Sequence, residues 1–291
     1  MSAAAVSAPD RYAVLGNPVS HSRSPFIHAA FARQTGQALE YARLWCPLDG
    51  FAASVRTFAA SRPRGQGPAR GCNVTVPFKR QAPALAQRVS ARAALAQAAN
   101  LLRFDDAGWF ADNTDGIGLV RDIESHAGFA IAGARVLLIG AGGAAAGVLG
   151  PLIEAGPREI VVANRTLENA DVLVMRHRAL AGSLPLAVRE LGACGGPFDL
   201  VINSSSSSMQ GLASPVPDAV LERGALAVDL MYGAAAEPFV AWAHALGAQA
   251  RDGLGMLVEQ AAEAFFVWRG VRPQTAPVLQ ALREQLAREA A

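Results

Sequence analysis

The sequence predicts an α/β protein with two domains, and three observations lead to this prediction. Short runs rich in β-branched residues alternate with longer Ala-rich helical patterns along almost all of the 291 residues. Strand candidates such as "RVLLIG" are apolar throughout, as in parallel sheets that helices cover on both faces. A glycine-rich strand-to-helix turn stands near Gly140, so the residues before it must build a separate domain. We expect one domain from residues 1–115 plus 252–291 and a doubly wound domain from residues 116–251.

The elements follow from local patterns along the chain. Runs of apolar and β-branched residues predict strands, and Ala-rich segments with helical periodicity predict helices. The segment "SRPRGQGP", residues 61–68, predicts a loop. The expected helices are Pro25–Gln34, Gly143–Ala155 and Glu168–Leu180, and the expected strands are residues 11–16, 40–45, 73–76, 100–104, 135–140, 159–164, 198–203 and 225–231.

Composition excludes several classes of function. Hydrophobic residues make up 52% of the chain and charged residues 17%, which suits a buried core. The net charge is +2 and the arginines are scattered, so nucleic acid is not an expected partner. The start of the chain lacks the pattern of a signal peptide, and no long uncharged apolar run could span a membrane. We therefore expect a soluble, cytoplasmic protein.

Cysteine and histidine patterns predict no metal site. The cysteines are odd in number and form no CxxC pair, which argues against a disulfide framework and a zinc site and favours a reducing compartment. The histidines show no metal-ligand spacing either. The residues concerned are Cys46, Cys72, Cys194, His21, His28, His126, His177 and His244.

The stretch "RVLLIGAGGAAAG" predicts a dinucleotide site. Gly140, Gly142 and Ala145 satisfy the pattern G-x-G-x-x-[G/A], directly after a strand and at the start of a helix. Glycines permit the tight turn and let the backbone approach a pyrophosphate, which then lies at the helix N-terminus. The alternative is an ordinary Ala/Gly-rich loop.

The end of the next strand, "EIVVANRT", favours NADP over NAD. In NAD-binding domains an acidic residue near this position accepts the ribose 2′-OH. Here the chain has Asn164, Arg165 and Thr166, and an arginine can pair with a 2′-phosphate. The alternative is a surface arginine at a strand end.

The stretch "VSHSRSPFIH" predicts a helix start and a candidate anion site. Ser24 followed by Pro25 is typical of an N-cap and first helical residue. Capping explains Ser24 but not Ser22, so the two hydroxyls at a helix N-terminus suggest a small carboxylate ligand.

In "NVTVPFK" the alternation of a strand predicts Val74 and Val76 on one face and Asn73 and Thr75 on the other. Lys79, which follows, is the only lysine in the chain, beside 25 arginines. Lysine can donate and accept a proton whereas arginine cannot. We therefore interpret Lys79 as a residue needed for proton transfer or as a compact ammonium group.

The stretch "ADNTDGIG" supplies the acidic residues Asp112 and Asp115. Asp115 could simply cap the helix that follows. An acid near Lys79 would keep its ammonium group charged and oriented.

Taken in order, "GNPVSHSRSP", "NVTVPFK", "DNTDG", "GAGGAAAG", "ANRT" and "DGLGMLVEQAA" resemble the shikimate dehydrogenase family. The resemblance extends from Tyr12 to Gly270. It implies NADP-dependent, reversible reduction of 3-dehydroshikimate to shikimate, in aromatic amino-acid biosynthesis. It also implies a substrate domain completed by the C-terminal helices and a Rossmann-type NADP domain.

The resemblance further implies roles for individual residues. Lys79 and Asp115 would be catalytic and would also bind the substrate, and Ser22 and Ser24 would bind the substrate carboxylate. The other substrate-binding residues would be Thr75, Asn100, Tyr232 and Gln260, and the cofactor-binding residues Gly140, Ala141, Gly142, Gly143, Ala144, Ala145, Asn164, Arg165, Thr166 and Gly253.

The chain also departs from the family pattern. Leu101 replaces a threonine after Asn100, Ala145 and Ala146 replace a common Ser-Arg pair, and Asn169 replaces a second arginine. The run Ser204–Ser208 replaces a less repetitive loop. The missing basic contacts to NADP leave open a quinate/shikimate dehydrogenase that uses NAD. A further alternative is a non-catalytic shikimate- or nucleotide-binding regulator, against which the retained lysine argues. We expect a monomer or a homodimer.

Overall fold

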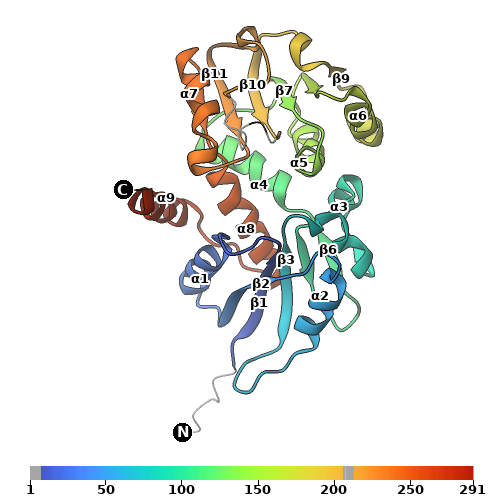
Figure 1. The fold of residues 1–291 in the computed structure, drawn as a ribbon, viewed down its shortest axis with the longest axis vertical. Coiled ribbons are helices and arrows are strands. Elements are labelled where there is room, and N and C mark those ends of the chain that lie inside the picture. Colours follow the sequence, from blue (N-terminus) through green and yellow to red (C-terminus); the bar gives the residue numbers. More distant parts are fainter. Residues whose placement is uncertain (1–7, 206, 208–212, 291) are drawn as a thin grey trace. The chain divides into compact units, whose positions relative to one another are not determined.

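The computed structural model describes residues 8–205, 207 and 213–290, and the chain divides into two compact units (Figure 1). Unit 1 comprises Met1–Thr114 and Ala261–Val278, and unit 2 comprises Asp115–Gln260 and Leu279–Ala291. Each unit contains a six-stranded sheet with helices packed against it. The predicted two-domain α/β fold is therefore confirmed, whereas the predicted domain boundaries stay a prediction.

Unit 1 has a mixed sheet with the strand order β2-β1-β3-β5-β6-β4. β1 is parallel to β2 and β3, while β5 is antiparallel to both β3 and β6. Its core includes the stacked rings of Phe51 and Phe78, whose centroids are 4.8 Å apart. Its strands are β1 (Asp10–Gly16), β2 (Leu39–Trp45), β3 (Ala69–Val74), β4 (Arg88–Val89), β5 (Leu101–Arg103) and β6 (Phe110–Asp112), and its helices are α1 (Ser24–Thr35), α2 (Phe51–Ala60) and α3 (Ala91–Ala96).

Unit 2 has an all-parallel sheet with the strand order β12-β11-β10-β7-β8-β9. This is the doubly wound order of dinucleotide-binding domains, in which ligands bind at the carboxyl ends of the strands where the order reverses. Here that point lies between β7 and β10. The strands are β7 (Arg135–Ile139), β8 (Glu159–Ala163), β9 (Leu186–Arg189), β10 (Phe198–Asn203), β11 (Leu221–Asp229) and β12 (Gln249–Arg251), and the helices are α4 (Asp115–Arg121), α5 (Gly143–Glu154), α6 (Leu167–Ala181) and α7 (Glu237–Ala245).

The last two helices, α8 (Leu254–Arg269) and α9 (Ala276–Ala290), contribute residues to both units. The predicted helices are found within one residue of their expected ends, and residues 61–68 form the expected loop. The prediction missed β4, β6, β9 and β12, because strands of two to four residues are too short to show a period.

The strand predicted at residues 73–76 was placed wrongly. β3 runs from Ala69 to Val74 and leaves the sheet at Thr75. Val74 is 1% exposed but Val76 is 60% exposed, so the two valines do not share a buried face. Alternation along a strand holds only while the chain stays in the sheet.

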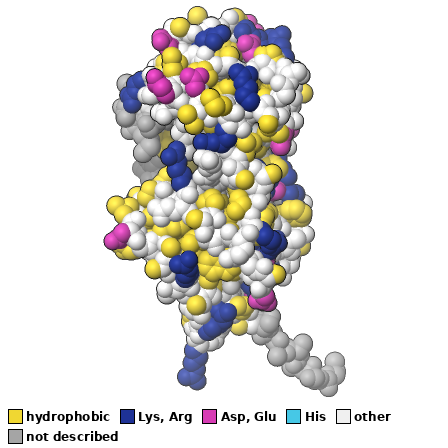
Figure 2. Space-filling model, turned by 90° about the vertical axis from the view of Figure 1, so that its right-hand side faces the viewer, with side chains coloured by type: hydrophobic (Ala, Val, Ile, Leu, Met, Phe, Trp, Pro, Cys, Tyr) yellow, Lys and Arg dark blue, Asp and Glu magenta, His cyan; other side chains and the backbone are white. Residues whose placement is uncertain are grey.

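Within the described ranges, no helix combines the length and apolarity needed to cross a membrane. The same residues contain no group of three or more His, Cys, Asp and Glu side chains that could hold a metal ion. All three cysteines are buried free thiols. On the face drawn in Figure 2, lysine and arginine side chains are dispersed among acidic and neutral ones rather than gathered into one patch.

Candidate active site

The glycine-rich turn of unit 2 joins β7 to α5. Gly140 has φ of +102°, which favours glycine, and a Cβ there would lie 2.8 Å from Ser204 Oγ. At Gly142, the N-cap of α5, a Cβ would meet no heavy atom within 4 Å. No acidic side chain occupies the first turn of α5, so its N–H groups suit an anion. The predicted cofactor residues Gly140, Ala141, Gly142, Gly143, Ala144 and Ala145 thus form a turn that can hold a pyrophosphate.

Ser204 and Ser205, which follow β10, lie beside this turn. Ser204 Oγ donates to Ile139 O at 2.6 Å, at the end of β7. Ser205 Oγ donates to Asn203 Oδ1 at 2.7 Å, and Asn203 Nδ2 donates to Asp229 Oδ2 at 3.0 Å. Ser204 therefore ties the end of β10 to β7, and Asn203 ties it to β11. Ser206 and Ser208 lie outside the described residues.

The end of β8 presents the predicted 2′-phosphate residues. Asn164 Nδ2 donates to Thr166 O at 2.8 Å, which closes the turn, while Arg165 and Thr166 are exposed. Asn164 N donates to Arg189 O at the end of β9, so a second exposed arginine lies at the neighbouring strand end. The sequence alone gave no signal for Arg189, because its position depends on the pairing of β8 with β9.

Tyr232 and Gly253 follow β11 and precede α8. Tyr232 is half-buried. A Cβ on Gly253 would lie 2.4 Å from Leu230 O, and Gly253 N donates to Met231 O at 2.8 Å. Gly253 therefore lets the two chain segments pass in direct contact.

Asp115 begins α4 in unit 2 and is 6% exposed. A Cβ on Gly116 would lie 2.4 Å from Gly147 O of α5, and a Cβ on Gly118 would lie 2.6 Å from Gln260 N of α8. The two glycines therefore allow α4 to pack closely against α5 and α8. This packing brings α4, which carries Asp115, against the backbone of Gln260.

In unit 1, Ser22 and Ser24 lie together at the start of α1. Ser22 Oγ donates to Ser24 Oγ at 3.2 Å, and Arg43 Nη2 donates to Ser22 O at 2.7 Å. The prediction that Ser24 is the N-cap is wrong. Arg23 occupies that position with helical φ of −88° and ψ of −6°, so the helix starts earlier and Ser24 is its first residue.

Thr75 and Lys79 lie on the turn that follows β3. Thr75 N donates to Leu15 O at 2.9 Å, and Ala99 N donates to Lys79 O at 2.8 Å. Lys79 is half-buried, and its neighbour Phe78 is fully buried in the core of unit 1. The backbone of the single lysine is therefore fixed beside the segment that carries Asn100.

Asn100 is the centre of a buried hydrogen-bond network. Its Oδ1 accepts from Thr114 N, and its Nδ2 donates to Thr114 Oγ1, both at 2.9 Å. Its carbonyl accepts from Asn73 Nδ2 at 3.0 Å, and Asn73 Oδ1 accepts from Tyr41 at 2.6 Å. Leu101, which departs from the family pattern, is 0% exposed in β5. The sequence did not single out Tyr41, because it lies on a strand far from the motifs.

The structure thus places Ser22, Ser24, Thr75, Lys79 and Asn100 in unit 1. It places Asp115, Gln260, Tyr232, Gly253 and the glycine-rich turn in unit 2. In each unit the predicted residues come from separate segments of the chain.

Comparison with known families covers most of the chain. The family described as "Shikimate dehydrogenase substrate binding domain" matches residues 14–102. "Shikimate / quinate 5-dehydrogenase" matches residues 123–231, and "Shikimate 5'-dehydrogenase C-terminal domain" matches residues 253–283.

Individual relatives match over nearly the whole chain. A protein of Methylibium petroleiphilum named shikimate dehydrogenase (NADP(+)) is 62% identical over 279 residues, which are 95% of each chain. A protein of the same name from Acidovorax sp. is 56% identical over 283 residues, 97% of this chain and 98% of its own.

Solved structures show the same fold. An Ael1 enzyme from Pseudomonas putida superposes with a TM-score of 0.85 at 47% identity, over 94% of this chain and 98% of its own. Shikimate 5-dehydrogenase from Thermus thermophilus, solved with NADP(H) and shikimate, has a TM-score of 0.81 at 28% identity, over 94% of this chain and 99% of its own.

Proposed function

The chain belongs to the shikimate dehydrogenase family, and we propose that it catalyses the NADP-dependent, reversible reduction of 3-dehydroshikimate to shikimate. This reaction is a step of aromatic amino-acid biosynthesis. The observation that carries the proposal is the 62% identity over 95% of both chains to a relative named for this activity. The turn at Gly140–Ala145 and the exposed Arg165 support NADP as the cofactor.

We assign the reaction chemistry to Lys79 and Asp115. When bound, NADPH supplies the hydride that reduces the ketone carbon of the substrate. Negative charge then develops on the ketone oxygen, and the ammonium group of Lys79 stabilises that charge and donates a proton to the oxygen. In this proposal Asp115 assists Lys79 in this step.

The remaining predicted residues bind and orient. Ser22 and Ser24 donate hydrogen bonds to the substrate carboxylate, a role that their adjacent hydroxyls at the start of α1 support. We assign the substrate hydroxyls to Thr75, Asn100 and Gln260. Tyr232 contacts the substrate, and Gly253 lies beside the cofactor. Asn164, Arg165 and Thr166 hold the 2′-phosphate of NADP, and an arginine contact of this kind contributes about 1.5–3 kcal/mol.

We further propose the predicted domain boundaries, with a substrate domain of residues 1–115 plus 252–291 and an NADP domain of residues 116–251. The reaction requires only a small-molecule substrate and a diffusible cofactor. This requirement is compatible with a cytoplasmic monomer or homodimer.

One set of initial rates tests the proposal and its alternatives. Shikimate and quinate are each assayed with NADP+ and with NAD+. We expect the highest kcat/KM for shikimate with NADP+. Equal or faster turnover of quinate with NAD+ would assign the chain to a quinate/shikimate dehydrogenase instead. Shikimate binding without turnover in any combination would indicate a regulator.

A further inference from the structure

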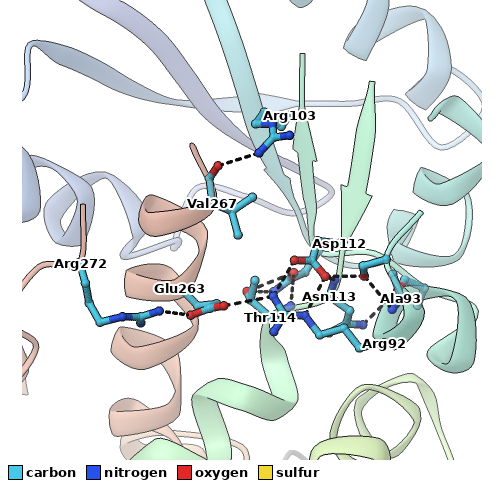
Figure 3. A network of polar contacts seen from close by, with 12 residues as sticks. Arg92, Ala93, Arg103, Asp112, Asn113, Thr114, Glu263, Val267 and Arg272 are labelled. Atoms are coloured by element: carbon cyan, nitrogen blue, oxygen red, sulfur yellow. Dashed lines mark hydrogen bonds and ion pairs between the residues drawn. The ribbon is translucent and has the colours of Figure 1, made fainter. Parts of the chain in front are cut away.

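An ion-pair network in unit 1 joins α3 and β6 to α8, which lies far from them in the sequence (Figure 3). Arg92, on α3, donates from Nε to Asp112 Oδ1 at 2.7 Å and from Nη2 to Asp112 Oδ2 at 2.6 Å. The same Nη2 lies 3.2 Å from Glu263 Oε1 on α8. Glu263 Oε2 in turn accepts from Arg272 at 2.7 Å. The contact of two Arg92 nitrogens with the one carboxylate of Asp112 is the geometry that favours arginine over lysine.

The carboxylates of this network are buried. Asp112 is 2% exposed and Glu263 is 6% exposed. Burial disfavours the charged guanidinium of Arg92, but the hydrogen bonds and charge of Asp112, with the charge of Glu263, raise its pKa above the ordinary value. Arg92 is thus held in its charged form, and its removal would leave the buried carboxylate of Asp112 without this ion pair.

Asp112 fixes the backbone around it. Besides Arg92, its Oδ1 accepts from Ser90 Oγ at 2.5 Å and from Asn113 N at 2.8 Å. Ser90 Oγ also caps α3 by accepting from Ala93 N at 3.1 Å. One carboxylate therefore anchors both the start of α3 and the end of β6.

The segment that Asp112 anchors holds Asn100. Asn100 N donates to Asp112 O at 3.0 Å, and Asn113 Nδ2 donates to Ala98 O at 3.1 Å. Thr114 then makes the two contacts that orient the Asn100 amide. Each residue from Asp112 to Thr114 is thus bonded to the segment 98–100, and Asp115 follows directly in the chain.

We infer that Arg92 is a positioning residue for the proposed reaction: by holding both oxygens of Asp112, it fixes the segment 112–114 and thereby the amide of Asn100. The inference rests on the proposed function, in which Asn100 binds a substrate hydroxyl. Arg92 itself contacts Asp112 and Glu263, and its effect on the substrate passes through Asn100.

The test compares two conservative variants in the same unit. Arg92→Lys keeps the charge but cannot place two nitrogens on the two oxygens of Asp112. Arg269→Lys is the matched control, because Arg269 also links α8 to the sheet through an ion pair, with Asp10, and also makes a second contact, with Gln37. The two arginine side chains are 25% and 18% exposed.

Both variants should lose a similar amount of thermal stability. Arg92→Lys should lower kcat/KM for shikimate by about tenfold or more, because one well-placed hydrogen bond to the substrate is lost. The KM for NADP+ should stay within about twofold of the wild-type value. Arg269→Lys should leave kcat/KM for shikimate nearly unchanged. In Arg92→Ala, millimolar guanidinium should restore part of the lost activity, whereas it should not improve Arg269→Ala.

Several results would overturn the inference. One is a folded Arg92→Lys enzyme with wild-type kcat/KM, and another is a loss in both variants that simply follows their melting temperatures. Shikimate affinity, measured by calorimetry on the same proteins, separates this inference from the proposed function. A wild-type chain that neither binds nor oxidises shikimate would refute both, whereas an active wild type with an unaffected Arg92→Lys would refute only the positioning role.

Discussion

The two units build their candidate sites in different ways. In unit 2, six of the ten predicted cofactor residues lie between the end of β7 and the first turn of α5, and all six are glycine or alanine. In unit 1, the predicted substrate residues are polar side chains held by buried hydrogen bonds, such as those between Asn100 and Thr114. Unit 2 can hold a ligand through local backbone geometry, whereas unit 1 depends on contacts between distant segments.

The difference has a physical origin in the two sheets. The all-parallel sheet of unit 2 brings the carboxyl ends of β7, β8 and β10 to the same end of the sheet. In the mixed sheet of unit 1, β5 lies antiparallel between β3 and β6, and the side chains of Asn73 and Thr114 add hydrogen bonds to Asn100 beside the backbone bonds of the sheet. Substitutions that preserve the local backbone should therefore be tolerated better in unit 2 than polar substitutions are in unit 1.

The largest effect is expected at the single lysine of unit 1. Lys79→Arg keeps the charge but removes a side chain that can transfer a proton, so kcat should fall by about 10²–10⁴-fold. The KM for NADP+ should barely change. Arg80→Lys, the exchange in the opposite direction at the exposed neighbour, is the control and should leave kcat unchanged. A folded Lys79→Arg enzyme with near wild-type kcat would show that the charge alone is needed.

The next effect is expected at the paired hydroxyls of α1. Replacing both Ser22 and Ser24 with Ala removes two hydrogen bonds to a charged carboxylate, each worth about 1.5–3 kcal/mol. The KM for shikimate should rise by about 100-fold or more, with little change in the KM for NADP+. Ser20→Ala, at an exposed position nearby, serves as the control. Unchanged shikimate kinetics in a folded double variant would exclude this carboxylate site.

A side chain is also expected to matter in unit 2, at the end of β8. Arg165→Ala should raise the KM for NADP+ by about 10–100-fold, the loss of a charge-assisted contact of about 1.5–3 kcal/mol, and should affect NAD+ much less. Arg178→Ala, in the last turn of α6, is the control. Equal effects on both cofactors would make Arg165 a structural residue and sharpen the contrast between the units.

A buried histidine is expected to make the stability of unit 1 depend on pH. His28 is 0% exposed, and its ring stacks on Tyr41 with 4.3 Å between centroids. Burial lowers the pKa of His28 to about 3, below the value of 6.5 expected for an unfolded chain. Between about pH 6.5 and 3 the unfolded chain therefore binds a proton at His28 that the folded chain does not bind. The contribution of neutral His28 to stability is present above pH 6.5 and is lost as the pH falls from there toward about 3.

His28 should contribute up to about 1.4 kcal/mol per pH unit to the pH dependence of the free energy of unfolding. His28→Phe keeps an aromatic ring at this position and removes the titrating group. Urea unfolding at several values between about pH 6.5 and 4.5 should therefore give a shallower slope for the variant. Parallel slopes for the two proteins would mean that His28 takes up a proton in the folded state.

The smallest effect is expected at the backbone site of unit 2. Gly142 has φ of −82°, and a Cβ there meets no heavy atom within 4 Å, so Gly142→Ala should fold with wild-type stability. The added methyl group would face a pyrophosphate and raise the KM for NADP+ several-fold. An unchanged KM would show that the cofactor does not approach this residue.

Parts of this protein could be predicted from local sequence. The apolar runs, the Ser-Pro start of α1 and the pattern around Gly140 were recognisable because conformation over a few residues depends mainly on those residues. The single lysine and the motifs around Thr75, Asn100 and Asp115 likewise marked candidate site residues. Local rules gave the wrong end for the strand at Val74 and the wrong cap for α1, since each depends on where the chain turns in three dimensions.

Only the tertiary structure decided which side chains support those residues. Arg92 and Glu263 are separated by 171 positions, and no local pattern relates them. The same holds for Tyr41 and Asn73, and for Ser204 and Ile139, which meet because strands pair in an order different from their order in the sequence. A sequence pattern sets the conformation of a short segment. The hydrogen bonds that fix a buried carboxylate or amide depend instead on which strands and helices become neighbours when the sheet forms.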